Sequence, residues 1–269
     1  MSRIKEKLID AKRRGGGFIP FVTGGDPDLA TSLAIVLKLA EMGADVIELG
    51  VPFTDPMADG PTIQLSSQRA IDAGATLQGV LDLAADFRKQ SDVPLVLFSY
   101  FNPILRFGLK RFADAATDAG IDGLLLTDVI ENEAATISQL LGEWNIDLIS
   151  LVAPTTSDER LEKICSVARG FIYAVSRAGV TGARDTTSSA AEELVMRTRR
   201  FTDLPVAVGF GISTAEQIAD VWRYADAAVV GSAIVNVIGS AASPDLAVSD
   251  VGSFVCGLLP QFAKMGREN

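Results

Sequence analysis

The chain has 269 residues, of which 48% are hydrophobic and 22% are charged, so it can bury a sizeable core. Its formal net charge of −10 argues against nucleic acid or an anionic membrane as a partner. The sequence contains no histidine, which excludes an imidazole base, a Ser-His-Asp triad and most zinc sites. We therefore expect no metal site, and we expect proton transfer to depend on Glu, Asp, Lys, Tyr or Cys.

Two features of the chain bear on where it works. Residues 1–8 lack a long apolar stretch, and no segment approaches the length of a membrane span, so we expect a cytoplasmic protein. Cys165 and Cys256 lie in apolar segments with a helical pattern. We expect both to be buried free thiols, as in a reducing compartment, rather than a disulfide or a nucleophile.

Short apolar segments alternate with longer amphipathic segments along the whole chain. The candidate strands are residues 18–22, 46–49, 95–99, 123–126, 147–151, 171–174, 206–208 and 227–230. Helical periodicity marks residues 29–42, 77–89, 109–119, 132–144, 158–168, 190–200 and 214–223. A polar helix over residues 2–14 is expected to plug the bottom of the fold, and residues 245–265 are expected to form the last helix.

Eight strand-like segments, each followed by a helix-like segment, indicate a closed parallel (β/α)8 TIM barrel with an extra N-terminal helix. No shift of composition and no linker divides residues 1–269, so we expect a single domain. An open doubly wound sheet is the alternative fold. It would carry a glycine fingerprint after an early strand, whereas Gly15, Gly16 and Gly17 precede one.

The segment over residues 45–61 is the most informative part of the chain. Glu48 lies near the end of a short apolar strand, and Asp55 and Asp59 follow in a loop rich in glycine and proline. Strand alternation places Val46 and Glu48 on the inward face, at the end of the barrel where active sites form. Burial would raise the pKa of Glu48 towards neutrality, where a carboxyl group can both take and give a proton. The alternative is a structural salt bridge.

Glycine-bearing loops follow the last three candidate strands, over residues 179–182, 209–213 and 231–233. Such loops let the backbone approach a ligand closely, and helix-start N–H groups there attract anions. Ser232 can either cap the helix that follows or donate its hydroxyl to a phosphate. We therefore expect a phosphorylated substrate.

The long loop over residues 176–189 is rich in Gly, Thr and Ser, as in lids that close over a substrate. Its alternative is an ordinary surface loop. Arg177 and Arg184 would orient the lid or the phosphate, or else be solvated.

These segments resemble the tryptophan synthase alpha chain family. The resemblance covers essentially the whole length and is carried by residues 21–27, 48–61, 100–103, 176–182, 209–213 and 231–233. It implies retro-aldol cleavage of indole-3-glycerol phosphate to indole and glyceraldehyde 3-phosphate, without a cofactor in this chain. In that reaction the Glu48 position is the main acid and base, and the Asp59 position holds the indole N–H.

The same resemblance assigns substrate-binding positions. Tyr173 lies near the reacting centre, although a packing role is an equal alternative, and Thr181 is the lid residue that pairs with the loop aspartate. The phosphate positions are Gly182, Phe210, Gly211, Gly231 and Ser232. The apolar positions expected around the indole ring are Phe21, Leu49, Phe98 and Leu125.

The resemblance also implies a partner, a beta chain that carries pyridoxal phosphate, in an alpha2beta2 hetero-tetramer. The positions at or near that contact are Pro52, Asp55, Asn102 and Asp128. The sequence departs from the family pattern at Ile130, where a proline is usual, and at Ser150, where a bulky apolar residue is common.

Three rival functions stay open at this point. Another phosphosugar isomerase or aldolase on the same barrel would use a Schiff-base lysine, a histidine or a metal. A regulatory subunit would only activate its partner and would have no need of Glu48 or Asp59. A stand-alone lyase would release indole freely.

Overall fold

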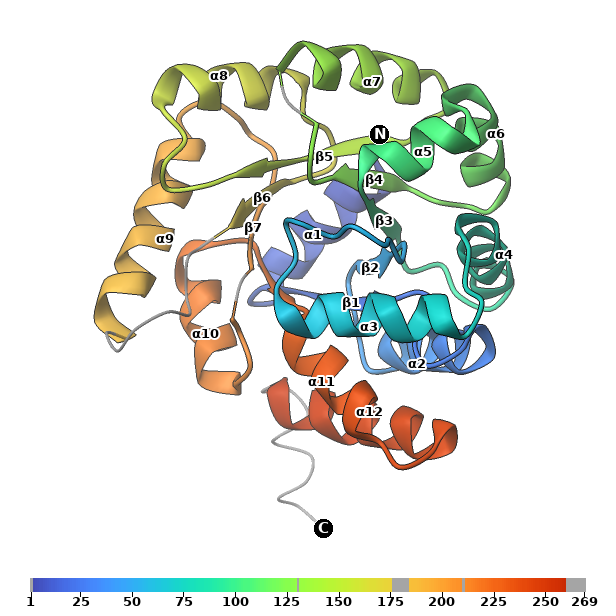
Figure 1. Cartoon of the computed structure of the whole chain (residues 1–269). Helices are drawn as coiled ribbons and strands as arrows, with labels where there is room; N and C mark the ends of the chain where they lie inside the picture. The colour runs from blue at the N-terminus through green and yellow to red at the C-terminus, as the bar shows by residue number, and fades with distance from the viewer. Residues whose placement is uncertain (1, 130, 176–183, 210, 260–269) are drawn as a thin grey trace.

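Eight parallel strands close into a barrel in chain order, with β1 paired to β8. The computed structural model describes residues 2–129, 131–175, 184–209 and 211–259 (Figure 1). The strands are β1 (Gly17–Thr23), β2 (Ile47–Gly50), β3 (Leu95–Ser99), β4 (Gly123–Leu126), β5 (Asp147–Val152), β6 (Ile172–Val175), β7 (Val206–Gly209) and β8 (Ala227–Val230). The predicted closed (β/α)8 barrel is confirmed, and the open sheet is excluded.

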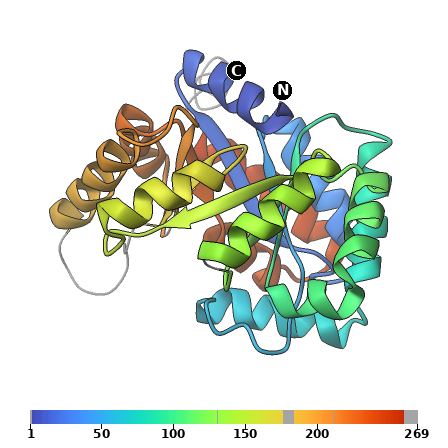
Figure 2. The same ribbon diagram turned by 90° about the horizontal axis from the view of Figure 1, so that it is seen from above.

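Helices surround the barrel on all sides, as two perpendicular views show (Figures 1 and 2). They are α1 (Arg3–Arg13), α2 (Leu29–Glu41), α3 (Pro61–Asp72), α4 (Leu77–Arg88), α5 (Phe101–Phe107), α6 (Leu109–Asp118), α7 (Glu131–Glu143), α8 (Asp158–Val167), α9 (Arg184–Thr198), α10 (Ala215–Tyr224), α11 (Ser232–Ser240) and α12 (Pro244–Leu258). Within the described ranges, no helix has the length and apolar composition that crossing a bilayer requires.

Most predicted elements agree with the structure to within one or two residues, but α3 and α5 were missed. The core-facing side of α3 consists of Ser66, Ser67 and Ala70, so it carries no apolar stripe that a periodicity search would find. Its start is marked only by Pro61 in the first helical position. Helix α5 has seven residues, which is too short for a periodic pattern.

Three further expectations need correction. Helix α9 begins at Arg184, so the part of the predicted loop from residue 184 to 189 is helical, while residues 176–183 lie outside the described residues. Cys165 is buried and free as predicted, whereas Cys256 is free but exposed. It lies next to Val255, which takes the buried side of α12. The last helix ends at Leu258, and residues 260–265 of its predicted span are not described.

Strand alternation separates two apolar layers. Val46 belongs to the cluster inside the barrel, whereas Ile47 and Leu49 belong to the outer cluster between strands and helices. Ile4 and Leu8 of α1 are fully buried in the inner cluster. The predicted N-terminal plug is therefore confirmed, because α1 fills the barrel from the end where the strands begin.

Aspartates link neighbouring strands by hydrogen bonds at that same end. Each precedes or begins a strand and accepts a hydrogen bond from a backbone N–H near the start of the preceding strand. The pairs are Asp45 with Phe18 (3.0 Å), Asp122 with Leu95 (2.9 Å) and Asp226 with Val206 (2.8 Å). An arginine neutralises each carboxylate, as Arg14 does for Asp45 at 2.7 Å. Buried charges of this kind persist because they are both paired and hydrogen-bonded.

Replacing Asp45 by alanine is expected to lower the free energy of unfolding by about 2–3 kcal/mol, because the buried N–H of Phe18 loses its acceptor. Urea denaturation followed by circular dichroism measures this. The matched control is Asp10→Ala, which removes an exposed ion pair with Arg13 and should cost less than about 0.5 kcal/mol. Equal losses in the two variants would contradict a structural role for the buried aspartate.

Candidate active site

A cavity of about 420 Å³ opens at the end of the barrel where the strands finish. Side chains from β1, β2, β3, β5, β6 and β8 line it together with the loop after β2. The lining residues are Phe21, Glu48, Ala58, Asp59, Gly60, Pro61, Thr62, Ile63, Phe98, Thr127, Leu151, Tyr173, Val175, Gly211, Val229, Gly231 and Ser232. The structure thus brings both predicted carboxylates into one cavity of the size that small ligands occupy.

Glu48 points into this cavity and is only 1% exposed. Burial raises the pKa of Glu48 to about 8. Among the described residues, its Oε1 has no hydrogen-bond partner and the side chain has no ion pair. Within the described part of the chain, a structural salt bridge therefore does not explain the carboxyl group at this position. A buried polar atom without a partner is rare in folded proteins and is typical of a functional group.

Asp59 lies on the loop between β2 and α3, and burial raises its pKa to about 6. The Tyr100 hydroxyl hydrogen-bonds to Asp59, which lowers the pKa of the carboxyl group and opposes the effect of burial. The same hydroxyl accepts a hydrogen bond from the Ala58 N–H at 2.8 Å. Burial, and secondly the charge of Asp59, raise the pKa of Tyr100 to about 12, so it remains a donor.

Tyr100 therefore fixes the loop that carries Asp59. We did not identify it as a site residue from the sequence. Its position directly after β3 was the available signal, because residues that follow barrel strands build the active site.

Tyr173 of β6 points into the barrel, and its hydroxyl lies against Gly209 of the neighbouring strand β7. A Cβ atom at Gly209 would overlap the Tyr173 hydroxyl, so the tyrosine has room only because residue 209 is glycine. Burial, together with the charge of Glu48, raises the pKa of Tyr173 well above its usual range. Tyr173 thus lies near Glu48 as a neutral phenol, and it lines the cavity as predicted.

The opposite rim of the cavity is formed by the start of α11. Gly231 is the N-cap of this helix, and no side chain in the described ranges caps its first N–H groups by a hydrogen bond. Ser232 is the first helical residue, so the capping alternative for its hydroxyl is excluded. Uncapped N–H groups at a helix start attract an anion. Gly211 also lines the cavity, with a φ of 74° that favours glycine.

The apolar wall of the cavity contains Phe21 and Phe98, whose rings meet edge to face with centroids 5.3 Å apart. Two other positions expected in this wall are placed elsewhere. Leu49 points outwards into the cluster between strands and helices, as strand alternation requires, so its predicted place in the cavity is wrong. Leu125 belongs to the inner cluster and does not line the cavity.

Positions predicted at a partner contact follow β2, β3 and β4 at the same end of the barrel, with Asn102 in the first turn of α5. Asn102 and Asp55 are exposed, and Asp55 accepts a hydrogen bond from the Thr54 hydroxyl at 2.6 Å. Pro52 is half-buried. Asp128 accepts a hydrogen bond from the Phe101 N–H at 2.8 Å and so caps α5. This local role shapes the surface that the loops present.

Three predicted positions, Thr181, Gly182 and Phe210, lie outside the described residues. Arg177, predicted on the same loop as Thr181, also lies outside them, and nothing is described of the Arg184 side chain. Among the residues that the structure does describe, no group of three or more His, Cys, Asp or Glu side chains could hold a metal ion.

The pH dependence of stability tests the burial of Glu48. Its pKa in the folded state is about 8, against 4.5 for the unperturbed group, so the folded protein binds one more proton between these values. Stability should therefore fall as pH rises through this range, by about 4 kcal/mol for this group. Glu48→Gln removes the effect.

The measurement is the difference in unfolding free energy between Glu48→Gln and the parent chain, which cancels the other titrating groups. We expect the unfolding free energy of the variant, relative to that of the parent chain, to increase between about pH 5 and about pH 8. A difference that stays constant over that range would mean that Glu48 is hydrated.

Comparison with known proteins identifies the family to which the chain belongs. The family model described as tryptophan synthase alpha chain matches residues 8–256. The chain is 47% identical to the tryptophan synthase alpha chain of Citrifermentans bemidjiense over 259 residues, which cover 96% of this chain and 97% of that protein. It is also 47% identical to that of Geobacter sulfurreducens, with 96% of this chain and 98% of that protein covered.

Solved structures agree in fold over nearly the full length. Tryptophan synthase subunit alpha from Legionella pneumophila superposes with a TM-score of 0.88 at 34% identity, covering 98% of this chain and 99% of that one. A chain of tryptophan synthase from M. tuberculosis in its aminoacrylate-bound form gives a TM-score of 0.84 at 32% identity, covering 96% and 100%. Because the family model spans the barrel from α1 to α12, the chain belongs to the tryptophan synthase alpha chain family.

Proposed function

We propose that this chain cleaves indole-3-glycerol phosphate to indole and glyceraldehyde 3-phosphate, as the alpha chain of tryptophan synthase. Membership of the family supports the reaction. The observation that carries the assignment to this site is the buried Oε1 of Glu48, which has no hydrogen-bond partner among the residues that the structure describes and faces a cavity rimmed by an uncapped helix start. A substrate with a reactive hydroxyl at one end and a phosphate at the other would place the hydroxyl at Glu48 and the phosphate at the helix start.

Glu48 is proposed as the acid and base of the reaction. With a pKa of about 8 it is largely neutral near pH 7, so it can first donate its proton to the indole ring carbon that bears the glycerol chain. The resulting carboxylate then takes the proton of the neighbouring glycerol hydroxyl. As that O–H bond breaks, a carbonyl forms, the bond to the ring carbon breaks, and its electron pair returns to the ring. Glu48 ends protonated, as it began.

Asp59 is proposed to accept a hydrogen bond from the indole N–H. Its pKa of about 6 leaves it largely ionised near pH 7, so its charge balances the positive charge that develops on the protonated ring. Tyr100 would hold this carboxylate in place by its hydrogen bond. Two carboxyl groups in different environments thus take different roles, as in other enzymes that pair an acid with a charged group.

The phosphate is proposed to bind at the start of α11, on the N–H groups of Gly231 and Ser232 and on the Ser232 hydroxyl. This site has no cationic side chain among the described residues that line the cavity, so helix-start N–H groups would supply the attraction. Gly211 would approach the phosphate from the other side, with Gly182 and Phe210. Thr181 is proposed as the lid residue.

The indole ring is proposed to lie against Phe21 and Phe98, with Tyr173 near the reacting centre. A Schiff-base aldolase is not supported, because the described lining contains no lysine. A purely regulatory subunit would not need an unpartnered carboxyl group buried in a cavity.

The proposed partner is the beta chain in an alpha2beta2 hetero-tetramer, reached through the segments after β2, β3 and β4 that carry Pro52, Asp55, Asn102 and Asp128. We propose that pyridoxal phosphate belongs to the beta chain only and that this chain uses no cofactor. The closed barrel formed by the first and last strands supports one domain over residues 1–269. The cytoplasmic location stays a prediction from the sequence.

Substitutions at the two carboxylates test the proposed chemistry. Glu48→Gln should lower kcat for indole formation by about 1,000-fold or more, and Asp59→Asn by about 100-fold. Both variants should keep the circular dichroism spectrum of the parent chain. The surface control Glu41→Gln, which loses only an exposed pair with Lys38, should keep full activity. Wild-type turnover in Glu48→Gln would rule out its role as acid and base.

The stand-alone lyase is the alternative function, and addition of a beta chain separates it from the subunit. Indole formation from indole-3-glycerol phosphate should rise at least about 10-fold when a beta chain is added, if docking orders the loops after β2 and β3. Asp55→Lys on the exposed loop should reduce this rise without changing the basal rate. A high rate that the beta chain leaves unaltered would favour the stand-alone lyase.

A further inference from the structure

The catalytic cavity, which holds Glu48 and Asp59, contains a second buried polar atom without a hydrogen-bond partner. Among the described residues, two buried side-chain atoms have no such partner, and these are Oε1 of Glu48 and Oγ1 of Thr127. Both residues line this one cavity. A buried hydroxyl that forms no hydrogen bond is costly and rare. The reaction proposed above uses Glu48 but gives Thr127 no role.

Strand pairing places Thr127 beside Tyr100. The parallel register of β3 and β4 pairs Ser99 with Leu126, and the Thr127 N–H donates to the Ser99 carbonyl at 3.2 Å. Tyr100 and Thr127 are therefore the next pair along the two strands. Side chains alternate between the faces of a sheet, so Tyr100 points to the same side as Phe98, which lines the cavity together with Thr127.

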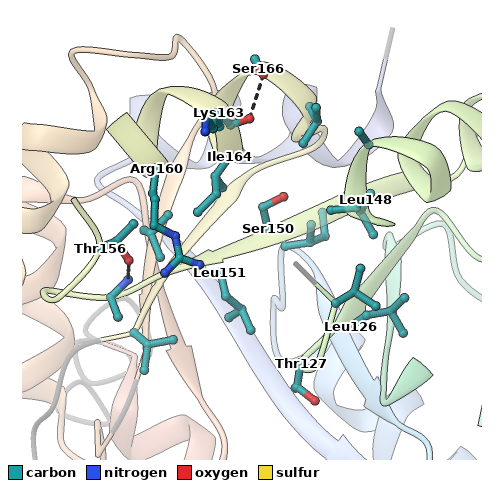
Figure 3. A pocket seen from close by; sticks show the side chains of 18 residues that line it. Leu126, Thr127, Leu148, Ser150, Leu151, Thr156, Arg160, Lys163, Ile164 and Ser166 are labelled. Carbon is teal, nitrogen blue, oxygen red and sulfur yellow. Dashed lines mark hydrogen bonds between the residues drawn. The ribbon is translucent and has the colours of Figure 1, made fainter. Parts of the chain in front are cut away.

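The Thr127 hydroxyl is directed towards the catalytic cavity. Thr127 also lines a second cavity, of about 490 Å³, beside β5, α7 and α8 (Figure 3). In Figure 3 its hydroxyl points away from the Ser150 and Arg160 side chains, which line that second cavity. A hydrogen-bond partner for this hydroxyl would therefore lie on the catalytic side.

The phenol oxygen of Tyr100 can accept one more hydrogen bond. It accepts one from the Ala58 N–H at 2.8 Å, while the phenol O–H bonds to Asp59. A hydroxyl oxygen has two acceptor lone pairs, so one remains. Burial raises the pKa of Tyr100 to about 12, and the nearby Thr127 hydroxyl acts in the opposite direction, as a donor to the phenol oxygen would. The two hydroxyls are thus close, so a small adjustment of the Thr127 side chain completes the bond.

We propose that Thr127 is a positioning residue of the lyase site, whose hydroxyl donates to the phenol oxygen of Tyr100 while the phenol donates to ionised Asp59. Hydrogen bonds in such a chain polarise one another, so a donor to the phenol oxygen strengthens the bond from the phenol to the carboxylate. The carboxylate would then stay ionised to a lower pH and stay in place for the ring N–H of the substrate. The effect on turnover rests on the proposed function, whereas the bond itself belongs to the substrate-free chain.

The test is the pKa of Asp59 in the substrate-free full chain, measured by carbon-13 NMR of the aspartate carboxyl groups and assigned with Asp59→Asn. Thr127→Val keeps the shape of the side chain and removes the hydroxyl. It should raise the pKa of Asp59, which is about 6 in the parent chain, by about 0.3 pH units. Thr127→Ser keeps the donor and should change that pKa by less than about 0.1 pH units.

Two further variants frame this result. Tyr100→Phe removes the bond to the carboxylate itself and should raise the pKa of Asp59 by about 1 pH unit. The matched control is Thr117→Val on α6, which makes the same chemical change at an exposed residue whose hydroxyl donates to the Ala113 carbonyl of its own helix at 2.8 Å. It should leave the pKa of Asp59 and turnover unchanged.

The pH profile of indole formation supplies a second measurement. The acid limb of kcat/KM should move to higher pH in Thr127→Val by the same amount, and Thr127→Ser should restore the parental profile. That limb reports Asp59, because the pKa of Glu48 is about 8 and that of Tyr173 lies well above its usual range. A merely structural defect would lower kcat equally at every pH.

An Asp59 pKa that is the same in Thr127→Val and the parent chain would overturn the proposal, whatever happens to turnover. A higher KM with an unchanged Asp59 pKa would mean that the hydroxyl contacts the substrate instead, and would overturn it too. Should Thr127→Val fail to fold, Thr127→Ala replaces it and the same rise is required. A parent chain that forms no indole would contradict the proposed function alone, because the NMR titration needs no turnover.

Discussion

The site depends on the burial of one carboxyl group, Glu48, inside the barrel. Transfer of a carboxylate from water into an apolar environment is costly, so the folded protein favours the neutral acid and raises its pKa to about 8. That shift is what makes one side chain able to give a proton and then take one near neutral pH. It requires the surrounding residues to exclude water and to offer no hydrogen-bond donor to Oε1.

The barrel meets this requirement by dividing its side chains into layers. Outward residues of the strands pack against helices and hold the wall rigid, while inward residues fill the interior from the α1 end upwards. Ile4 and Leu8 close the bottom, so the only polar groups of β2 and β6 that reach the cavity are Glu48 and Tyr173. Aspartates such as Asp45 carry their charges at the opposite end, where arginines neutralise them.

The same layering explains why two cavities lie on either side of one strand. Leu151 points inwards and lines both cavities, while its neighbour Ser150 points outwards and lines the second one. The cavity inside the barrel is the one proposed to hold the substrate. The space outside it is lined by several small side chains, which are Ala134, Ala135, Ser150 and Ala153.

The loop that carries Asp59 is held in place by contacts on both sides. Its carboxyl group and the preceding Ala58 N–H both bond to the Tyr100 hydroxyl, which is itself fixed at the end of β3. The tyrosine therefore holds the loop in position, and its hydrogen bond partly opposes the rise in the pKa of Asp59 that burial causes. Pro61 then starts α3 at once, which limits the freedom of the loop from its other side.

By itself, the sequence determined the order of strands and helices, the inward direction of Glu48 and the plugging role of α1. These follow from periods of two and 3.6 residues, which are local properties of a chain. It did not reveal α3, whose buried face is built from serines, and it placed Cys256 in the interior although that residue is exposed.

Only the tertiary structure decided which groups Glu48, Asp59 and Ser150 meet. The resemblance had put Leu49 in the cavity, but alternation turns it outwards. The raised pKa of Glu48, the bond between Tyr100 and Asp59 and the space beside Ser150 depend on segments that are distant in sequence. Desolvation and side-chain pairing are set by whatever fills the surrounding volume, and no local pattern records that.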